Sequence, residues 1–267
     1  MNIGIIQYKK GSQSAKLLQA TLKKVWLFGK VFRTKPFKAP IKLNWGSSDT
    51  SNFRKTYLVF NHPLKTKIAT NKIATFKKLK EANVSIPPFT TSVEEAKQWL
   101  QDGWKLVQRE TVTGYHGAGI SVARSLTDFK EAPLYTRYFP KRKEYRVIVV
   151  DGESIIFMRK ILKPELEDEG HSEIRNADRY IYSEIPQEAL QTLNNLKNLA
   201  ESAIKALELD YGAVDIIYNL QNQTYYVLEI NTAFGLGERN VGRVATKIGE
   251  MVAKRIIKVA SGNLENS

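Results

Sequence analysis

The stretch DYGAVDIIYNLQNQTYYVLEIN, residues 210–231, decides how the rest of the chain is interpreted. Residues 213–219 are apolar and rich in β-branched side chains, and residues 224–231 alternate in a similar way. The polar residues 220–223 between them are typical of a turn. The pattern predicts two antiparallel strands joined as a hairpin.

The register of this hairpin brings three polar residues onto one face. If Asn219 pairs with Tyr225, Asp215 lies directly opposite Glu229. Asn231 shares the face of Glu229, because side chains of a strand alternate between its two faces. Two carboxylates and an amide oxygen are hard ligands suited to Mg²⁺ that is held jointly with phosphate oxygens. The alternative is a hairpin with three polar residues on its wet face.

The length and composition limit the classes of protein to which the chain can belong. A chain of 267 residues forms one large domain or two to three small lobes. Since the chain contains no cysteine, it has neither disulfides nor thiolate metal sites. The N-terminus has no signal-peptide pattern and no apolar stretch approaches membrane-spanning length. We therefore expect a soluble cytoplasmic protein with no membrane partner.

The net charge of +14 is unevenly distributed. Residues 1–80 contain 18 Lys or Arg and a single acid, Asp49, so this segment carries +17 while the remainder is slightly acidic. A basic block of this kind indicates an anionic partner, such as an acidic polypeptide or nucleic acid. The alternative is a solvated basic surface without a dedicated partner.

The N-terminal half predicts short strands and several helices. Residues 2–7 predict a strand, and residues 15–24 a helix that Ser12 or a neighbour caps. Pro36 and Pro40 predict an irregular or edge segment over 31–43, and residues 44–48 are loop material after a short strand. Apolar spacing predicts one helix over 67–82, and Ser92 with Glu95 is a capping box for a second over 92–100.

A glycine-rich segment follows the strand predicted at 105–109. It contains Gly114, Gly117 and Gly119 and precedes another strand at 120–124. A dinucleotide-binding loop would open a helix instead, so this segment is the tip of a hairpin. Backbone N–H groups of such a tip can approach phosphates closely. The alternative is a plain flexible hairpin.

The C-terminal half predicts further strands and two long helices. Residues 134–139 predict a strand, and Asp151-Gly152 predicts a tight turn between strands at 144–150 and 153–161. A short strand is expected at 180–183, and amphipathic helices at 187–207 and 244–259.

This order of elements, with Tyr211-Gly-Ala-Val-Asp215, Leu228-Glu-Ile-Asn231 and Glu144-Tyr-Arg146, resembles the ATP-grasp superfamily. The branch it resembles is that of ribosomal-protein glutamate ligases and their phage and bacillar relatives, over about residues 67–257. The resemblance implies an α+β ATP-grasp fold in which two lobes clamp ATP. It implies three parts: a basic N-terminal lobe at 1–66, a first subdomain at 67–133 and a second subdomain at 134–267. The first subdomain contains the glycine-rich hairpin tip at 111–119, called the flap below, and the second contains the metal-binding hairpin.

The resemblance also implies roles for individual residues. Asp215, Glu229 and Asn231 would hold Mg²⁺, for which Mn²⁺ can substitute, and the glycine hairpin would cover the ATP phosphates. Catalytic roles fall to Arg146, Lys160 and Arg175. The remaining ATP contacts would come from the following residues, together with Lys160 and Arg175: Lys72, Arg109, Gly114, Gly117, Gly119, Arg137, Tyr138, Phe139, Glu144 and Asn176.

Two residues depart from the family pattern. Arg109 stands where the family usually has lysine, and arginine holds phosphate differently. Arg137 replaces the usual acidic residue of the hinge, where backbone groups of residues 137–139 would contact the adenine edge. This change matters only if the side chain contacts the nucleotide.

The function that the resemblance implies is an ATP-dependent carboxylate–amine ligase that forms an amide through an acyl phosphate. Its partners would be ATP, a carboxylate and an amine, as in an amino acid and a peptide or protein. Such chemistry needs positioning and charge neutralisation rather than a nucleophile–base pair. The alternatives are a polyanion-binding module and an ATP-grasp phosphotransferase.

Overall fold

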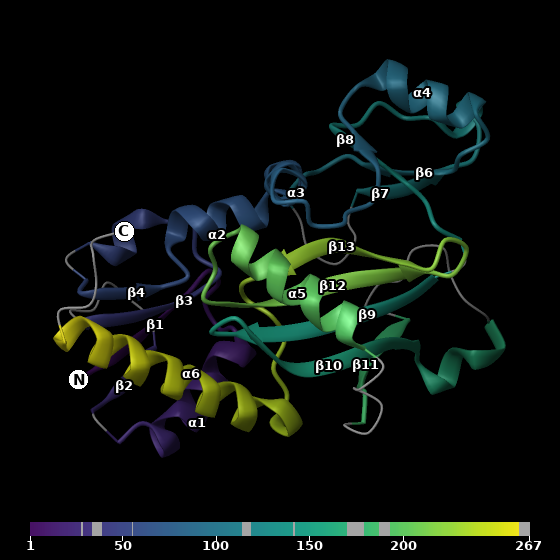
Figure 1. Cartoon of the computed structure of the whole chain (residues 1–267). Helices are drawn as coiled ribbons and strands as arrows, with labels where there is room; N and C mark the ends of the chain where they lie inside the picture. The colour runs from purple at the N-terminus through teal and green to yellow at the C-terminus, as the bar shows by residue number, and fades with distance from the viewer. Residues whose placement is uncertain are drawn as a thin grey trace.

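A computed structural model describes residues 1–27, 29–33, 39–54, 56–113, 119–140, 142–169, 179–186 and 193–261. The described residues form three β-sheets that follow one another along the chain, with helices on their faces (Figure 1).

The first sheet is parallel, with strand order β2-β1-β3-β4. Its strands are β1 (Ile3–Gln7), β2 (Val31–Arg33), β3 (Ile41–Trp45) and β4 (Leu58–Phe60), and α1 (Gln13–Val25) follows β1. The hydroxyl of Ser12 accepts a hydrogen bond from the amide of Ala15, so the predicted cap of this helix is confirmed. Two helices, α2 (Pro63–Thr70) and α3 (Lys72–Glu81), then lead away from this sheet.

The second sheet is small and antiparallel, with order β5-β8-β6-β7. It comprises β5 (Phe89–Thr90), β6 (Leu106–Arg109), β7 (Ile120–Ala123) and β8 (Leu134–Arg137), and α4 (Val93–Gln101) packs on one face. β6 and β7 pair with Arg109 opposite Ile120, which confirms the hairpin beneath the glycine-rich tip. β8 is hydrogen-bonded within this sheet, whereas the predicted domain boundary lies just before it; the division into domains stays a prediction.

The third sheet is antiparallel, with order β11-β10-β9-β12-β13. It comprises β9 (Arg142–Val150), β10 (Glu153–Leu162), β11 (Tyr180–Glu184), β12 (Tyr211–Asn219) and β13 (Thr224–Asn231). Helix α5 (Asn194–Ala206) covers one face, packing on Val147, Val149 and Val214 among others. The opposite face therefore remains for α6 (Glu238–Ala260) and for the polar residues described below.

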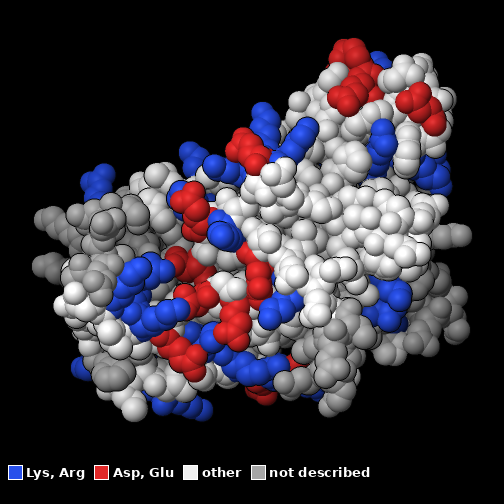
Figure 2. Space-filling view, viewed as in Figure 1, with Lys and Arg blue, Asp and Glu red and all other residues white. Residues whose placement is uncertain are grey.

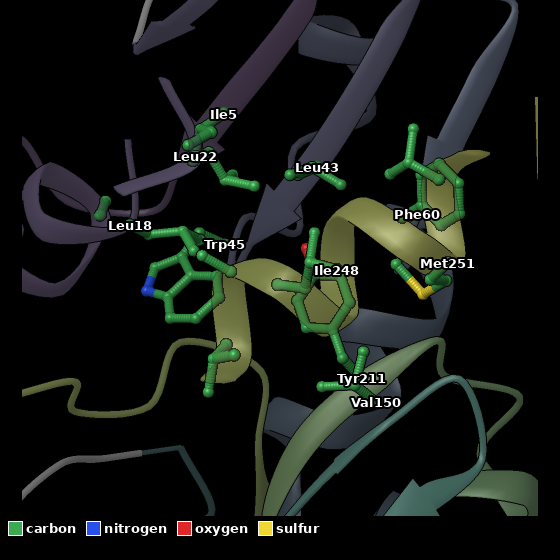
Figure 3. Packing of buried hydrophobic residues seen from close by; sticks show 14 of the residues in the cluster. Ile5, Leu18, Leu22, Leu43, Trp45, Phe60, Val150, Tyr211, Ile248 and Met251 are labelled. Carbon is green, nitrogen blue, oxygen red and sulfur yellow. The ribbon is translucent and has the colours of Figure 1, made fainter. Parts of the chain in front are cut away.

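One core joins the first sheet to the third. Trp45 of β3 packs on the rings of Tyr211 and Phe234, with ring centroids 5.8 Å and 4.7 Å apart. Figure 3 shows Tyr211 and Val150 meeting Ile248 of α6 beneath the strands of the first sheet. This burial fixes the carboxyl end of β3 beside the chain that leaves β13.

A buried polar network crosses the same junction. Asn61 has a left-handed backbone (φ 57°), and its side-chain oxygen accepts from the amides of Asp210 (2.8 Å) and Tyr211 (3.2 Å). Its side-chain nitrogen donates to the carbonyl of Tyr211 at 2.8 Å. Asparagine tolerates the left-handed region, and its short amide satisfies three buried backbone groups at once.

Several predicted elements need correction. Residues 67–82 are not one helix, because Asn71 ends α2 and its side chain caps α3 by accepting from the amide of Ala74. Residues 41–45 form a buried inner strand rather than an irregular or edge segment, and this strand includes Asn44 and Trp45 of the predicted loop. α6 begins six residues earlier than expected. α5 is described from residue 194, and the predicted helical residues 187–192 lie outside the described part of the chain.

The predicted pairing of Asp215 with Glu229 is confirmed, although the register at the turn is not. Asn219 pairs with Thr224 instead of Tyr225. If this register continued along both strands, Asp215 would lie opposite Leu228. A β-bulge between Asp215 and Ile216 restores the pairing of Asp215 with Glu229.

The surface visible in Figure 2 carries mixed charges. Lys and Arg intermingle with Asp and Glu over α5 and α6, so this face has no uniform basic surface. Within the described residues, no helix combines the length and apolar character needed to cross a membrane.

Candidate active site

The polar site lies on the face of the third sheet that α5 does not cover. Along β9 and β12 this face is apolar at Ile148 and Ala213, which belong to the core beneath α6. Two residues further on it becomes charged, at Arg146 and Asp215, which are paired across the strands. The same face then carries polar side chains from every strand: Tyr182, Lys160, Glu144, Arg146, Asp215, Glu229 and Asn231.

Asp215 is the most heavily bonded of these residues. Arg146 donates to both of its oxygens, from Nε to Oδ1 at 2.6 Å and from Nη2 to Oδ2 at 2.7 Å. Tyr182 adds a hydrogen bond to Oδ1 at 3.3 Å and Asn231 one to Oδ2 at 3.2 Å. Burial raises the pKa of the Asp215 carboxyl, and the Arg146 guanidinium opposes this rise.

Glu229 is held from a different element. The ammonium of Lys72, the first residue of α3, forms an ion pair with its carboxylate, and the backbone amide of Lys72 donates to the carbonyl of Val112 at 3.0 Å. Burial acts to raise the pKa of Glu229, but Lys72 and the surrounding hydrogen bonds outweigh it and hold that pKa well below its usual range. Lys72 thus links the base of the flap to the hairpin.

Glu144 forms a second charged cluster beside the first. Arg142 donates from Nε to Oε1 at 2.8 Å and Lys160 from Nζ to Oε2 at 3.2 Å. All three side chains are largely buried. Arginine keeps its charge under these conditions, since Glu144 raises the pKa of Arg142 against the effect of burial.

Arg109 is a half-buried cation without an acidic partner in the described ion pairs. It lies at the end of β6, where β7 pairs with it, and its Nε has no hydrogen-bond partner within the described residues. Burial lowers the pKa of its guanidinium and the charge of Glu229 opposes this. Gly119, at the foot of the flap, has φ 68° and its carbonyl accepts from the amide of Glu110 at 2.8 Å.

The side chain of Arg137 is used for packing. Its guanidinium lies 4.8 Å from the ring centroid of Trp99 and 4.2 Å from that of Trp104. Tyr135, two residues earlier on β8, packs with Trp99 in the core beneath α4, so both side chains lie on the helix-covered face. The departure from an acidic residue at the hinge is therefore compatible with contacts made by the backbone.

The hinge backbone is partly engaged within the protein. The amide of Arg137 donates to the carbonyl of Pro88 at 3.1 Å, and that of Tyr138 to Lys105 at 2.8 Å. Pro88 lacks an N–H and cannot donate to the carbonyl of Arg137 in return. Next to the hinge, the guanidinium of Arg142 lies 4.9 Å from the ring of Tyr138, and Phe139 stacks on Tyr226 of β13 at 5.1 Å.

The donor set of the hairpin fits Mg²⁺. Asn231 lies between the two carboxylates, with its amide 3.2 Å from Asp215 Oδ2 and 3.1 Å from Glu229 Oε1. A rotation of this amide by 180° would direct its oxygen to the same point. Carboxylate and amide oxygens are the ligands that Mg²⁺ accepts, with waters and phosphates completing its shell. No group of three or more His, Cys, Asp or Glu side chains suited to a metal occurs within the described ranges.

The structure thus brings most of the predicted residues together. Gly114, Gly117, Arg175 and Asn176 lie outside the described residues. The side chain of Arg137 packs on Trp104, away from the polar face of the third sheet. Two residues of the site were not identified from the sequence, Arg142 and Tyr182. The alternation Arg142, Glu144, Arg146 on one strand face could have identified the first, whereas Tyr182 joins the site only through the order of the strands.

The structure is similar to several ATP-grasp ligases. One is PsnB complexed with a phosphomimetic variant of a minimal precursor, Mg and ADP, with TM-score 0.67, 14% identity, and coverage of 94% of this chain and 98% of that one. Another is D-alanine–D-alanine ligase from Bacillus anthracis, with TM-score 0.68, 15% identity, and coverage of 99% and 100%. A third is a RiPP-associated ATP-grasp ligase from Chryseobacterium gregarium complexed with ADP and a leader and core peptide, with TM-score 0.62, 16% identity, and coverage of 95% and 97%.

These likenesses show that the chain has the ATP-grasp fold, an α+β architecture, as its motifs predict. No protein-family model matches the sequence, and no curated protein matches it significantly. The resemblance to ribosomal-protein glutamate ligases in particular stays a prediction from the motifs.

Proposed function

We propose that this chain is an ATP-dependent carboxylate–amine ligase that forms an amide bond through an acyl phosphate. One observation carries the proposal. On an ATP-grasp fold, the oxygen donors Asp215, Glu229 and Asn231 share a sheet face with Arg146 and Lys160. A site of this composition can neutralise the charge of a transferring phosphoryl group, and it needs no nucleophilic side chain.

The residues divide into three tasks in this proposal. Mg²⁺ bound at Asp215, Glu229 and Asn231 would supply charge neutralisation at the ATP phosphates. Lys72 and Arg109 hold the phosphates from the side of the flap. Arg146 and Lys160, with Arg175, hold the acyl phosphate while the amine attacks its carbonyl carbon, the C–O bond to the phosphorus-bound oxygen breaks, and inorganic phosphate and a proton leave.

Adenine would lie against the hinge. In this proposal the edge of adenine forms hydrogen bonds with the carbonyl of Arg137 and the amide of Phe139. The carbonyl of Arg137 is available because Pro88, opposite it, has no N–H to donate. Glu144, fixed by Arg142 and Lys160, would face the ribose. The Arg137 side chain takes no part in this contact, because it is stacked between two tryptophans.

The substrates are a carboxylate and an amine, at least one of them part of a peptide or an amino acid. This assignment is supported by the similar proteins, whose complexes include precursor peptides or which join D-alanine. The excess of lysine in residues 1–80 favours an acidic polypeptide among them.

The first test is ADP release from ATP and MgCl₂ with pooled amino acids and peptides. Turnover should require both a carboxylate and an amine, and it should fall by at least about 100-fold in Asp215→Asn and Glu229→Gln. Glu81→Gln is the control, because that carboxylate is exposed and pairs only loosely with Lys78, at 3.8 Å. Unchanged turnover in both site variants would refute the assignment.

Two further readouts separate the alternatives. A phosphotransferase would form a stable phosphoester without an amine. A polyanion-binding module would be stabilised by a polyanion in a salt-sensitive manner, and ATP with MgCl₂ would leave its melting temperature unchanged. A ligase is stabilised by ATP with MgCl₂.

A further inference from the structure

Tyr182 occupies a position that the proposed roles leave unused. It lies on the edge strand β11, directly opposite Lys160 of β10, and its ring is partly buried against the core beneath α6. Its ring and its hydroxyl both contact charged groups of the site. A tyrosine that served only to cover the sheet edge would need neither contact.

The hydroxyl of Tyr182 reaches the proposed metal ligand. It donates to Oδ1 of Asp215 at 3.3 Å, the same oxygen that receives Nε of Arg146 at 2.6 Å. The other oxygen, Oδ2, receives Arg146 at 2.7 Å and Asn231 at 3.2 Å. Each oxygen of the carboxylate therefore has one bond from Arg146 and one from a neutral side chain.

The ring of Tyr182 contacts the cations. The guanidinium carbon of Arg146 lies 4.2 Å from the ring centroid, and the ammonium of Lys160 lies 5.7 Å from it. Both distances are within the range in which a cation is attracted to an aromatic face. One side chain thus orients two cations and one carboxylate.

We propose that Tyr182 is a positioning residue that keeps Asp215 and Arg146 in register for the metal and the phosphates. The inference rests on the proposed function of this site. When Arg146 turns toward a phosphate, Asp215 loses its two strongest bonds, and when the amide oxygen of Asn231 turns to the metal, Tyr182 still holds Oδ1 of the carboxylate. The carboxylate keeps its plane, and the ring limits how far the guanidinium can move.

The two parts of the side chain can be tested separately. Tyr182→Phe removes the hydroxyl and keeps the ring, whereas Tyr182→Leu removes both. Tyr225→Phe is the matched control, because Tyr225 packs on Tyr145 and Tyr218 on the opposite face of the same sheet. ATP binding is measured by calorimetry as MgCl₂ is varied, and melting temperatures are recorded with and without ATP and MgCl₂.

We expect the MgCl₂ midpoint for ATP binding to rise about tenfold in Tyr182→Phe, the lower end of the effect of losing an outer-shell partner of a metal ligand. ATP affinity at saturating MgCl₂ should stay near that of the wild type in this variant. It should fall by about threefold or more in Tyr182→Leu, which also loses the cation–π contact. Tyr225→Phe should leave both quantities unchanged.

The inference is overturned if Tyr182→Leu matches the wild type in midpoint and affinity, or if it only lowers the melting temperature without ligands. Both results presuppose a wild-type protein that binds ATP with MgCl₂. Absence of binding by the wild type would instead refute the proposed function, so the two failures can be told apart.

Discussion

Replacement of Arg146 by methionine should destabilise the fold, and the loss should depend on pH. The variant leaves the Asp215 carboxylate, whose side chain is 12% exposed, with only the neutral donors Tyr182 and Asn231 at 3.3 and 3.2 Å. Removing one partner of a buried ion pair costs about 3–5 kcal/mol. For a chain of this size that corresponds to a fall in melting temperature of roughly 10 °C.

The direction of the pH dependence follows from Asp215. Burial already raises its pKa, and Arg146 is the main group that opposes this. Without Arg146 the folded variant binds a proton that the unfolded chain, with a carboxyl pKa of about 3.9, has released. Stability of the variant therefore falls as pH rises above about 4 toward the raised pKa of the folded state. The deficit relative to wild type should be larger at pH 8 than at pH 5.

The measurement is urea unfolding at pH 5 and pH 8, followed by tryptophan fluorescence. Arg243→Met provides the control, because its ion pair with Glu184 is exposed and should contribute less than about 1 kcal/mol. Adding Asp215→Asn to Arg146→Met should recover part of the loss, since no charge then remains buried. A deficit below about 1 kcal/mol at both pH values would refute this account of the pair.

Three other substitutions test separate parts of the structure. Asn61→Ala should cost about 3 kcal/mol or more in urea unfolding, because buried amides lose their acceptor and alanine disfavours φ 57°; a loss under about 1 kcal/mol would contradict the network. Arg137→Met should cost about 1–2 kcal/mol and leave ATP affinity unchanged by calorimetry; a tenfold weaker affinity with full stability would place its side chain at the nucleotide. Lys72→Met should lower the melting temperature at pH 7, and the gap to wild type should narrow as pH falls below about 4. The reason is that the depressed pKa of Glu229 stabilises the folded wild type at pH values above the ordinary carboxyl pKa of about 4.3. A difference in melting temperature that is independent of pH would contradict this role of the ion pair.

The hairpin shows what local sequence can and cannot predict. Alternation placed Asp215 opposite Glu229 correctly, but the pairing beside the turn is shifted by one residue and a bulge restores the pairing of Asp215. A bulge adds one residue to a single strand, so it cannot be deduced from the turn alone.

Other errors arose where tertiary contacts override local pattern. Pro36 and Pro40 favoured an irregular or edge segment, and β3 also contains the polar residues Lys42 and Asn44. In the folded chain Lys42 donates to the carbonyl of Asn52 at 2.7 Å, and Asn44 donates to those of Ser47 and Asn61. Buried polar groups are tolerated when they are hydrogen-bonded, but the partners lie up to 17 residues away and are invisible to a local pattern. The break at Asn71 was hidden because apolar spacing continues across it.

The charges of the site point to the kind of ligand that it accommodates. Its described residues include three carboxylates, Glu144, Asp215 and Glu229, each with a cationic partner. Glu144 has two such partners, and Arg109, whose Nε is buried, has no acid bonded to it in the described ion pairs, so positive charge is in excess. A buried guanidinium is costly unless an anion compensates it. Arg109 lies at the end of β6, and burial lowers the pKa of its guanidinium, so an anion bound beside this residue would stabilise its charge.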